Sequence, residues 1–75
     1  SVRRHEGVTT KRHKLIRFYG KDVPNGEEWE FYDLETDPEE MHSQYRNPEQ
    51  ATIVASLKKE LKRLRKEYKV PNSTP

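Results

Sequence analysis

The spacing of apolar residues predicts three β-strands in the first half of the chain. Residues 12–19 and 28–34 alternate with a period of two, so that both faces of each strand carry apolar side chains. A weaker first strand is predicted over 2–10, with Gly7 as a weak point or a bulge. The pair Asn25-Gly26 favours a tight turn, so the three strands are expected to form an antiparallel meander.

The second half of the chain has the spacing of one amphipathic helix. Asn47 is a suitable N-cap, Pro48 suits the first helical position, and Pro71 ends the helical pattern. Between them, apolar residues recur every three or four positions and form one stripe over about five turns. The residues of this stripe are Ile53, Leu57, Leu61, Leu64 and Tyr68.

The segment between the last strand and the helix also has a helix-start signal. Asp37 is followed by Pro38 and two glutamates, which is the order of an acidic cap, a first-position proline and negative charge near the helix dipole. We therefore expect a helical turn or two before Arg46.

These elements define a small α+β domain. The sheet of about three antiparallel strands and the long C-terminal helix each have an apolar side, so the helix is expected to pack on one face of the sheet. Residues 1–70 form this single domain in the prediction, and residues 71–75 form a disordered tail. With 75 residues, 29% of them hydrophobic and 37% charged, the core is thin and favours contact with a neighbouring domain.

The charge and hydropathy of the chain limit its partners. Its formal net charge is only +2, which is too small to imply nucleic-acid binding. No apolar run approaches the roughly 20 residues of a membrane-spanning helix. The chain is therefore expected to bind neither nucleic acid nor membrane, and its first residues are interpreted as the interior of a longer polypeptide.

Two motifs in the chain resemble the carboxy-terminal segment of sulfatases. The first is Gly-Val-Thr-Thr-Lys-Arg-His-Lys-Leu-Ile at 7–16, and the second is Glu-Trp-Glu-Phe-Tyr-Asp-Leu-Glu-Thr-Asp-Pro at 28–38. Their order and spacing match the family, and the resemblance extends from Val2 to Tyr68. The sequence departs from the family at Ser43-Gln44, where Asn-Leu is common, and Tyr45 is expected to supply the missing apolar anchor.

The resemblance implies that the chemistry lies outside this chain. Sulfatases of this family react through a formylglycine beside a calcium ion, in a larger amino-terminal α/β domain. This chain has no Cys, and none of its Ser residues lies in the motif that becomes formylglycine. The chain is thus expected to hold no catalytic residue, metal or cofactor, to pack on the catalytic domain of the same polypeptide, and to line a cleft for a sulfated sugar. The family also implies a periplasmic or secreted location.

The best candidates for substrate binding are Arg3, Arg4 and His5. A sulfated sugar requires cationic walls rich in hydrogen-bond donors, and guanidinium groups bind such anions by paired donors. In the sulfatases that this chain resembles, a His or Arg at the start of this strand contacts the substrate. Alternate residues of a strand share a face, so Arg3 and His5 form the preferred pair.

An alternative function remains open for the whole chain, and two structural roles remain open for Asp33. The chain is a free-standing basic module for anionic glycans or nucleic acid if Arg3, Arg4, Lys11, Arg12 and the basic residues of the helix act together. Asp33 has the setting of a structural carboxylate, which either accepts hydrogen bonds at the end of the sheet or pairs with Lys14. Glu35, Asp37 and Glu39 lack the pattern of a calcium loop.

Overall fold

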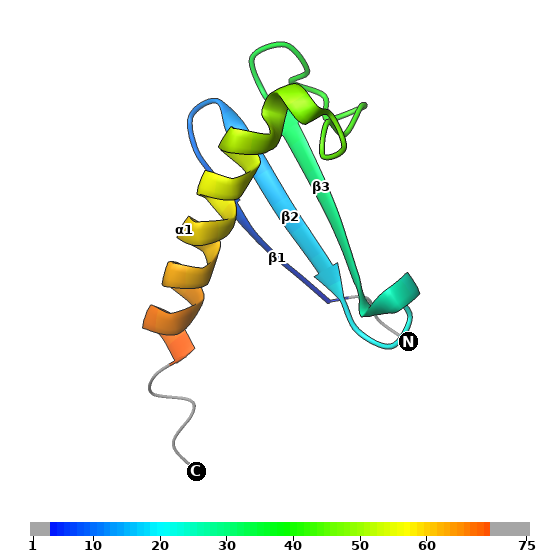
Figure 1. Cartoon of the computed structure of the whole chain (residues 1–75), viewed down its shortest axis with the longest axis vertical. Helices are drawn as coiled ribbons and strands as arrows, with labels where there is room; N and C mark the ends of the chain where they lie inside the picture. The colour runs from blue at the N-terminus through cyan, green and yellow to red at the C-terminus, as the bar shows by residue number, and fades with distance from the viewer. Residues whose placement is uncertain (1–3, 70–75) are drawn as a thin grey trace.

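The computed structural model describes residues 4–69 and has one sheet and one long helix. Strands β1 (Arg4–Thr9), β2 (His13–Tyr19) and β3 (Glu27–Asp33) pair antiparallel in that order, and helix α1 spans Ala51–Lys69 (Figure 1). The α+β prediction is confirmed, and the observed strands lie within the predicted ranges to one or two residues. Arg3, the end of the helix at Pro71 and the predicted tail 71–75 lie outside the described residues.

The helix covers one face of the sheet, and the strand register determines which side chains it meets. Val8, Leu15 and Phe31 oppose one another across the three strands, so they form a row on one face. This row packs against three buried residues of α1, which are Val54, Leu57 and Leu61. We call the face beneath the helix the covered face and the other face of the sheet the open face.

The predicted apolar stripe of the helix is correct in its middle and wrong at its end. Leu57 and Leu61 are buried, while Ile53 and Leu64 pack at the margin of the core. Tyr68 is 70% exposed, because the core contacts end about one turn earlier, at Leu64. Val54, which is not in the predicted stripe, is buried in the core instead.

Gly7 lies in a regular part of the strand ladder, and the predicted bulge is wrong. It pairs with Ile16 in unbroken register. A Cβ atom at this position would lie 2.8 Å from the carbonyl oxygen of Leu15. The glycine therefore allows β1 and β2 to approach closely.

Two turn regions of the chain contain a residue in the left-handed region of backbone conformation. Asn25 has a φ of 57° and lies in the short 3₁₀ turn η1 (Pro24–Gly26), as expected for the Asn-Gly pair. Glu40 has a φ of 56° and follows the Asp-Pro motif. Within the described segment 34–47 the chain makes turns and no helix, so the predicted helical turn at Asp37 is wrong. The left-handed conformation of Glu40 does not continue a right-handed helix.

Asp37 still caps this segment, and the segment then closes the free edge of β3. The carboxylate of Asp37 accepts hydrogen bonds from the backbone N–H groups of Met41 and His42, at 3.0 Å each. Further along, the Phe31 N–H donates to Ser43 Oγ at 3.1 Å, and the Phe31 carbonyl accepts from the Gln44 N–H at 2.7 Å. These bonds satisfy backbone groups that an edge strand would otherwise expose.

The start of the long helix agrees with the sequence prediction. Asn47 accepts a hydrogen bond from the Glu49 N–H at 3.0 Å through its side chain. Pro48 begins a single 3₁₀ turn, η2 (Pro48–Gln50), which leads directly into α1. The cap satisfies one of the N–H groups that have no partner inside the helix.

Replacement of Gly7 tests the close approach of β1 and β2. In Gly7→Ala, the added methyl group collides with the backbone of Leu15, which cannot move without separating the strands. We expect the free energy of unfolding to fall by about 1–3 kcal/mol. Urea unfolding followed by the fluorescence of Trp29, the one tryptophan of the chain, measures this loss.

The matched control is Thr9→Ala, at an exposed position of the same strand. It should change the free energy of unfolding by no more than about 0.5 kcal/mol. An equal loss in both variants would contradict a specific role for the glycine.

Candidate functional site

The predicted substrate-binding residues lie at the exposed start of β1. Arg4 opposes Tyr19 and His5 opposes Phe18 in the β1–β2 register, so their side chains lie on opposite faces of the sheet. His5 is exposed on the open face, and its ring centroid lies 5.9 Å from that of Phe18. Arg4 is exposed on the covered face. The geometry thus separates Arg4 from His5, as the alternation rule predicts, and Arg3 lies outside the described residues.

The open face around His5 combines apolar and charged side chains. Phe18 and Ile16 are only partly buried on this face. At its other end Lys14 forms an ion pair with Glu40 at 3.0 Å. The hydroxyl of Tyr32 donates to Glu30 at 2.6 Å, and this hydrogen bond, with burial, raises the pKa of Tyr32 to about 12. The surface therefore presents apolar area close to the one histidine of β1.

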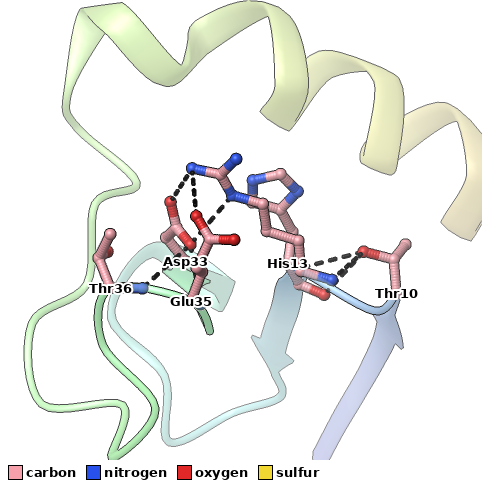
Figure 2. A network of polar contacts seen from close by, with 6 residues as sticks. Thr10, His13, Asp33, Glu35 and Thr36 are labelled. Carbon is pink, nitrogen blue, oxygen red and sulfur yellow. Dashed lines mark hydrogen bonds and ion pairs between the residues drawn. The ribbon is translucent and has the colours of Figure 1, made fainter.

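Asp33 has a structural environment at the end of the sheet, where Figure 2 shows it beside Glu35 and Thr36, opposite Thr10 and His13. Its carboxylate accepts from Arg12 Nη2 at 3.1 Å and Nε at 3.3 Å, and from the backbone N–H of Glu35 at 3.0 Å. The hydrogen bonds from Arg12, then those from the backbone, lower the pKa of Asp33. An aspartate in this setting stays ionised and joins the β1–β2 turn to the segment after β3.

One of the two pairings considered for Asp33 is confirmed and the other is wrong. Asp33 accepts backbone hydrogen bonds at the end of the sheet, as expected. It does not pair with Lys14, because Lys14 opposes Tyr32 on the open face while Asp33 opposes His13 on the covered face. Lys14 pairs with Glu40 instead.

A charged network joins the helix to the sheet beneath it. Glu6 accepts from Arg65 Nε at 3.2 Å and from Arg17 Nη1 at 2.8 Å, and Arg17 Nε donates to Glu27 at 2.7 Å. Burial alone would raise the pKa of Glu6, but the hydrogen bonds from Arg65 and Arg17 hold that pKa below its ordinary value. The network fixes α1 over β1 and β3 through charged groups at the margin of the core.

A cluster of aromatic and cationic side chains lies at the β3 edge. Lys58 Nζ lies 4.4 Å from the Trp29 ring centroid and donates to the Tyr45 hydroxyl at 2.6 Å. The rings of Trp29 and Tyr45 are nearly parallel, with centroids 6.0 Å apart. Tyr45 packs against the core, so its predicted role as an apolar anchor is confirmed.

A cleft of about 470 Å³ lies next to this cluster. Trp29 and Tyr45 contribute to its lining, and its charged residues are Glu27, Glu28, Glu30 and Arg46. Carboxylates outnumber the cation, which disfavours a sulfate group there. This cleft is therefore a poor candidate for the binding of a sulfated sugar.

Two further findings concern metals and membranes. Within residues 4–69, no group of three or more His, Cys, Asp or Glu side chains lies close enough together to hold a metal ion. No helix in that part of the chain is long and apolar enough to cross a bilayer.

Comparison with protein families identifies the chain as a sulfatase C-terminal domain. The sequence model of the family "N-sulphoglucosamine sulphohydrolase, C-terminal" matches residues 1–67. The chain belongs to this family, and the resemblance inferred from its two motifs is confirmed.

Two relatives show how much of a sulfatase the chain represents. It is 41% identical over 69 residues to the N-acetylglucosamine-6-O-sulfatase of Bacteroides thetaiotaomicron, an alignment that covers 92% of this chain and 12% of that protein. It also matches a solved structure of BT4656 in complex with its substrate D-glucosamine-2-N,6-O-disulfate, with 40% identity and a TM-score of 0.80. That match covers 92% of this chain and 13% of the other. The chain thus spans about an eighth of the length of these relatives.

Sequence reasoning found the strand that carries His5 but missed most of the ion pairs. The pairing of Arg12 with Asp33 and that of Arg65 with Glu6 join residues 21 and 59 positions apart. Only the strand register and the position of the helix bring these groups together. The sequence did contain one signal for the ion pairs of Glu6. Glu6 lies on the same face of its strand as Val8, and a carboxylate that a helix covers beside apolar side chains requires a cationic partner.

Replacement of Glu6 tests the network between helix and sheet. Folding lowers the pKa of Glu6, so ionised Glu6 stabilises the fold fully at pH values above its ordinary pKa of 4.5. This stabilisation is lost as the pH falls from 4.5 through the lowered pKa of the folded state. At pH 7 we expect Glu6→Gln to lose about 1–2 kcal/mol in the free energy of unfolding. Urea unfolding measures the difference from the parent chain at neutral and at acidic pH.

The difference between the two proteins should shrink at acidic pH, because Glu6 is then protonated in the parent chain as well. Glu39→Gln, at an exposed position outside the network and outside any helix, is the control and should stay close to the parent at every pH. A constant Glu6→Gln deficit across the whole pH range would refute an ionic contribution.

Proposed function

We propose that this chain is the C-terminal subdomain of a sulfatase that hydrolyses a sulfate ester on a glucosamine sugar. In this proposal it packs on the catalytic domain of the same polypeptide and lines one side of the substrate cleft. The observation that carries the proposal is the 41% identity to an N-acetylglucosamine-6-O-sulfatase over 92% of the chain. The similarity to the structure solved with a disulfated glucosamine supports the same class of substrate.

The open face of the sheet is the surface that we assign to the catalytic domain. The single helix covers the other face, so Ile16 and Phe18 stay only partly buried. Apolar area of this kind is stabilised when a neighbouring domain removes it from water. Contact at this face also brings the start of β1 close to the catalytic domain.

His5 is the residue that we assign to the substrate. It is exposed at the start of β1, on the same open face as Phe18. An imidazole donates a hydrogen bond to a sugar hydroxyl or a sulfate oxygen, and it adds positive charge when it is protonated. Arg3 stays a candidate from the sequence alone, because it lies outside the described residues, and Arg4 lies on the covered face, away from His5.

The reacting groups belong to the catalytic domain in this proposal. No metal-binding group occurs within residues 4–69, and the chain has no Cys. A formylglycine and a calcium ion, when present in the catalytic domain, supply the nucleophile and stabilise negative charge. The role of this chain is then to bind and orient the sugar.

The test of this proposal is a His5→Ala variant of the complete polypeptide, with both domains present. If His5 contacts the sugar, kcat/KM for the release of sulfate from 6-O-sulfated N-acetylglucosamine should fall about 10- to 100-fold, which corresponds to the loss of one or two hydrogen bonds. Lys11→Ala, in the exposed β1–β2 turn, should retain full activity.

Two results would contradict the proposal. Absence of sulfate release by the parent enzyme from any sulfated glucosamine would exclude the function. Full activity of His5→Ala would exclude His5 from the cleft while leaving the assignment to sulfatases unchanged.

A further inference from the structure

Three lysines form a stripe on the outer side of α1. Lys59, Lys62 and Lys66 follow one another at spacings of three and four residues, so they lie on one face of the helix. All three are exposed, and they lie on the side opposite to the buried Leu57 and Leu61. We call them the lysine stripe.

The positive charge of this stripe is not neutralised within residues 4–69. None of the three lysines has an ion-pair partner in that part of the chain. The two carboxylates closest to the stripe on α1 are already engaged, because Glu60 and Glu67 bind Arg63 at 2.7 and 3.1 Å. Arg65, by contrast, faces inward to Glu6. Arg63 and Arg65 thus form ion pairs within the chain, whereas Lys59, Lys62 and Lys66 are exposed to solvent.

The stability of the helix does not account for this arrangement. Like charges three or four residues apart destabilise a helix by a few tenths of a kcal/mol per pair. Attraction to the negative end of the helix dipole falls off beyond the last turn, so it favours Lys66 but not Lys59 or Lys62. Glutamine would serve equally well at these exposed positions, because its helix propensity is close to that of lysine.

We propose that the lysine stripe binds a sulfated polysaccharide, at a site separate from the cleft that we assign to His5. The inference rests on the proposed function, since a sulfatase that acts on sulfated sugars meets polymers with a dense negative charge. Seven residues of α1 rise by about 10 Å, so the stripe presents three cations along a line. Such a line suits a linear polyanion, and binding to it releases counterions. The stripe holds the enzyme on the polymer while the cleft processes one sugar.

The test compares two variants of the complete polypeptide that lose the same charge. The stripe variant combines Lys59→Gln, Lys62→Gln and Lys66→Gln. The control variant combines Lys11→Gln, Lys21→Gln and Arg46→Gln, whose parent side chains are exposed but scattered over the surface. Binding of fluorescently labelled heparin is measured between about 50 and 200 mM salt. Hydrolysis of a sulfated monosaccharide is measured in parallel.

The stripe variant should bind heparin roughly 100-fold more weakly at the lowest salt, and the magnitude of the slope of log K against log salt should fall by about 2, as expected for the loss of three ionic contacts. The deficit should therefore narrow to about 6-fold at the highest salt. The control variant should change affinity less than about 2-fold. Both should hydrolyse the sulfated monosaccharide like the parent, because the stripe lies on the side of α1 that faces away from the sheet.

Three outcomes would overturn the inference. Equal weakening in the two variants would show that net charge alone attracts heparin, and unchanged binding in both would show that the stripe plays no part. Equal losses for heparin, for duplex DNA and for phosphatidylserine vesicles would show that the stripe has no preference for a sulfated polysaccharide. Failure of the parent to hydrolyse the monosaccharide refutes the proposed function instead, so the two failures are distinguishable.

Discussion

The contact between the Val8–Leu15–Phe31 row and helix α1 is the interaction on which the rest of the structure depends. Leu15 and Phe31 are fully buried, and all three strands contribute one residue to the row. One helix can cover only one face of a three-stranded sheet, so the same contact defines a covered face and an open face. Phe18 is therefore only partly buried on the open face, which supports our assignment of that face to a second domain.

The position of the helix also determines how the charges are used. Because α1 lies over β1, Arg65 reaches Glu6, and Glu6 in turn reaches Arg17. Other basic residues are held by ion pairs at the ends of the sheet, as Arg12 and Lys14 are. The chain contains 15 Lys and Arg residues, and five of those that the structure describes form ion pairs with its own carboxylates: Arg12, Lys14, Arg17, Arg63 and Arg65. Among the described cations without such a partner, Lys59, Lys62 and Lys66 lie in line on one face of α1.

The chain belongs to a sulfatase C-terminal family, and this membership bears on the use of the surfaces that the fold leaves exposed. The chain spans about an eighth of the length of its relatives, and no metal-binding group occurs within residues 4–69. In our proposal, the chain contributes to the active site of the complete polypeptide through its surface. The exposed start of β1 offers one such surface, and the outer side of α1 offers another at a distance from it.

The order of residues along the chain was enough to predict the three strands, the capped helix, the family and the alternation that separates Arg4 from His5. Each of these depends on local spacing, which is visible along the chain. Tertiary structure alone decided that Asp33 pairs with Arg12 and not Lys14, that Val54 is buried and Tyr68 exposed, and that Glu40 ends the turn after Asp37. Those outcomes depend on register, on the length of the contact between helix and sheet, and on a left-handed residue. Each couples residues far apart in the chain or follows from packing that no local pattern encodes.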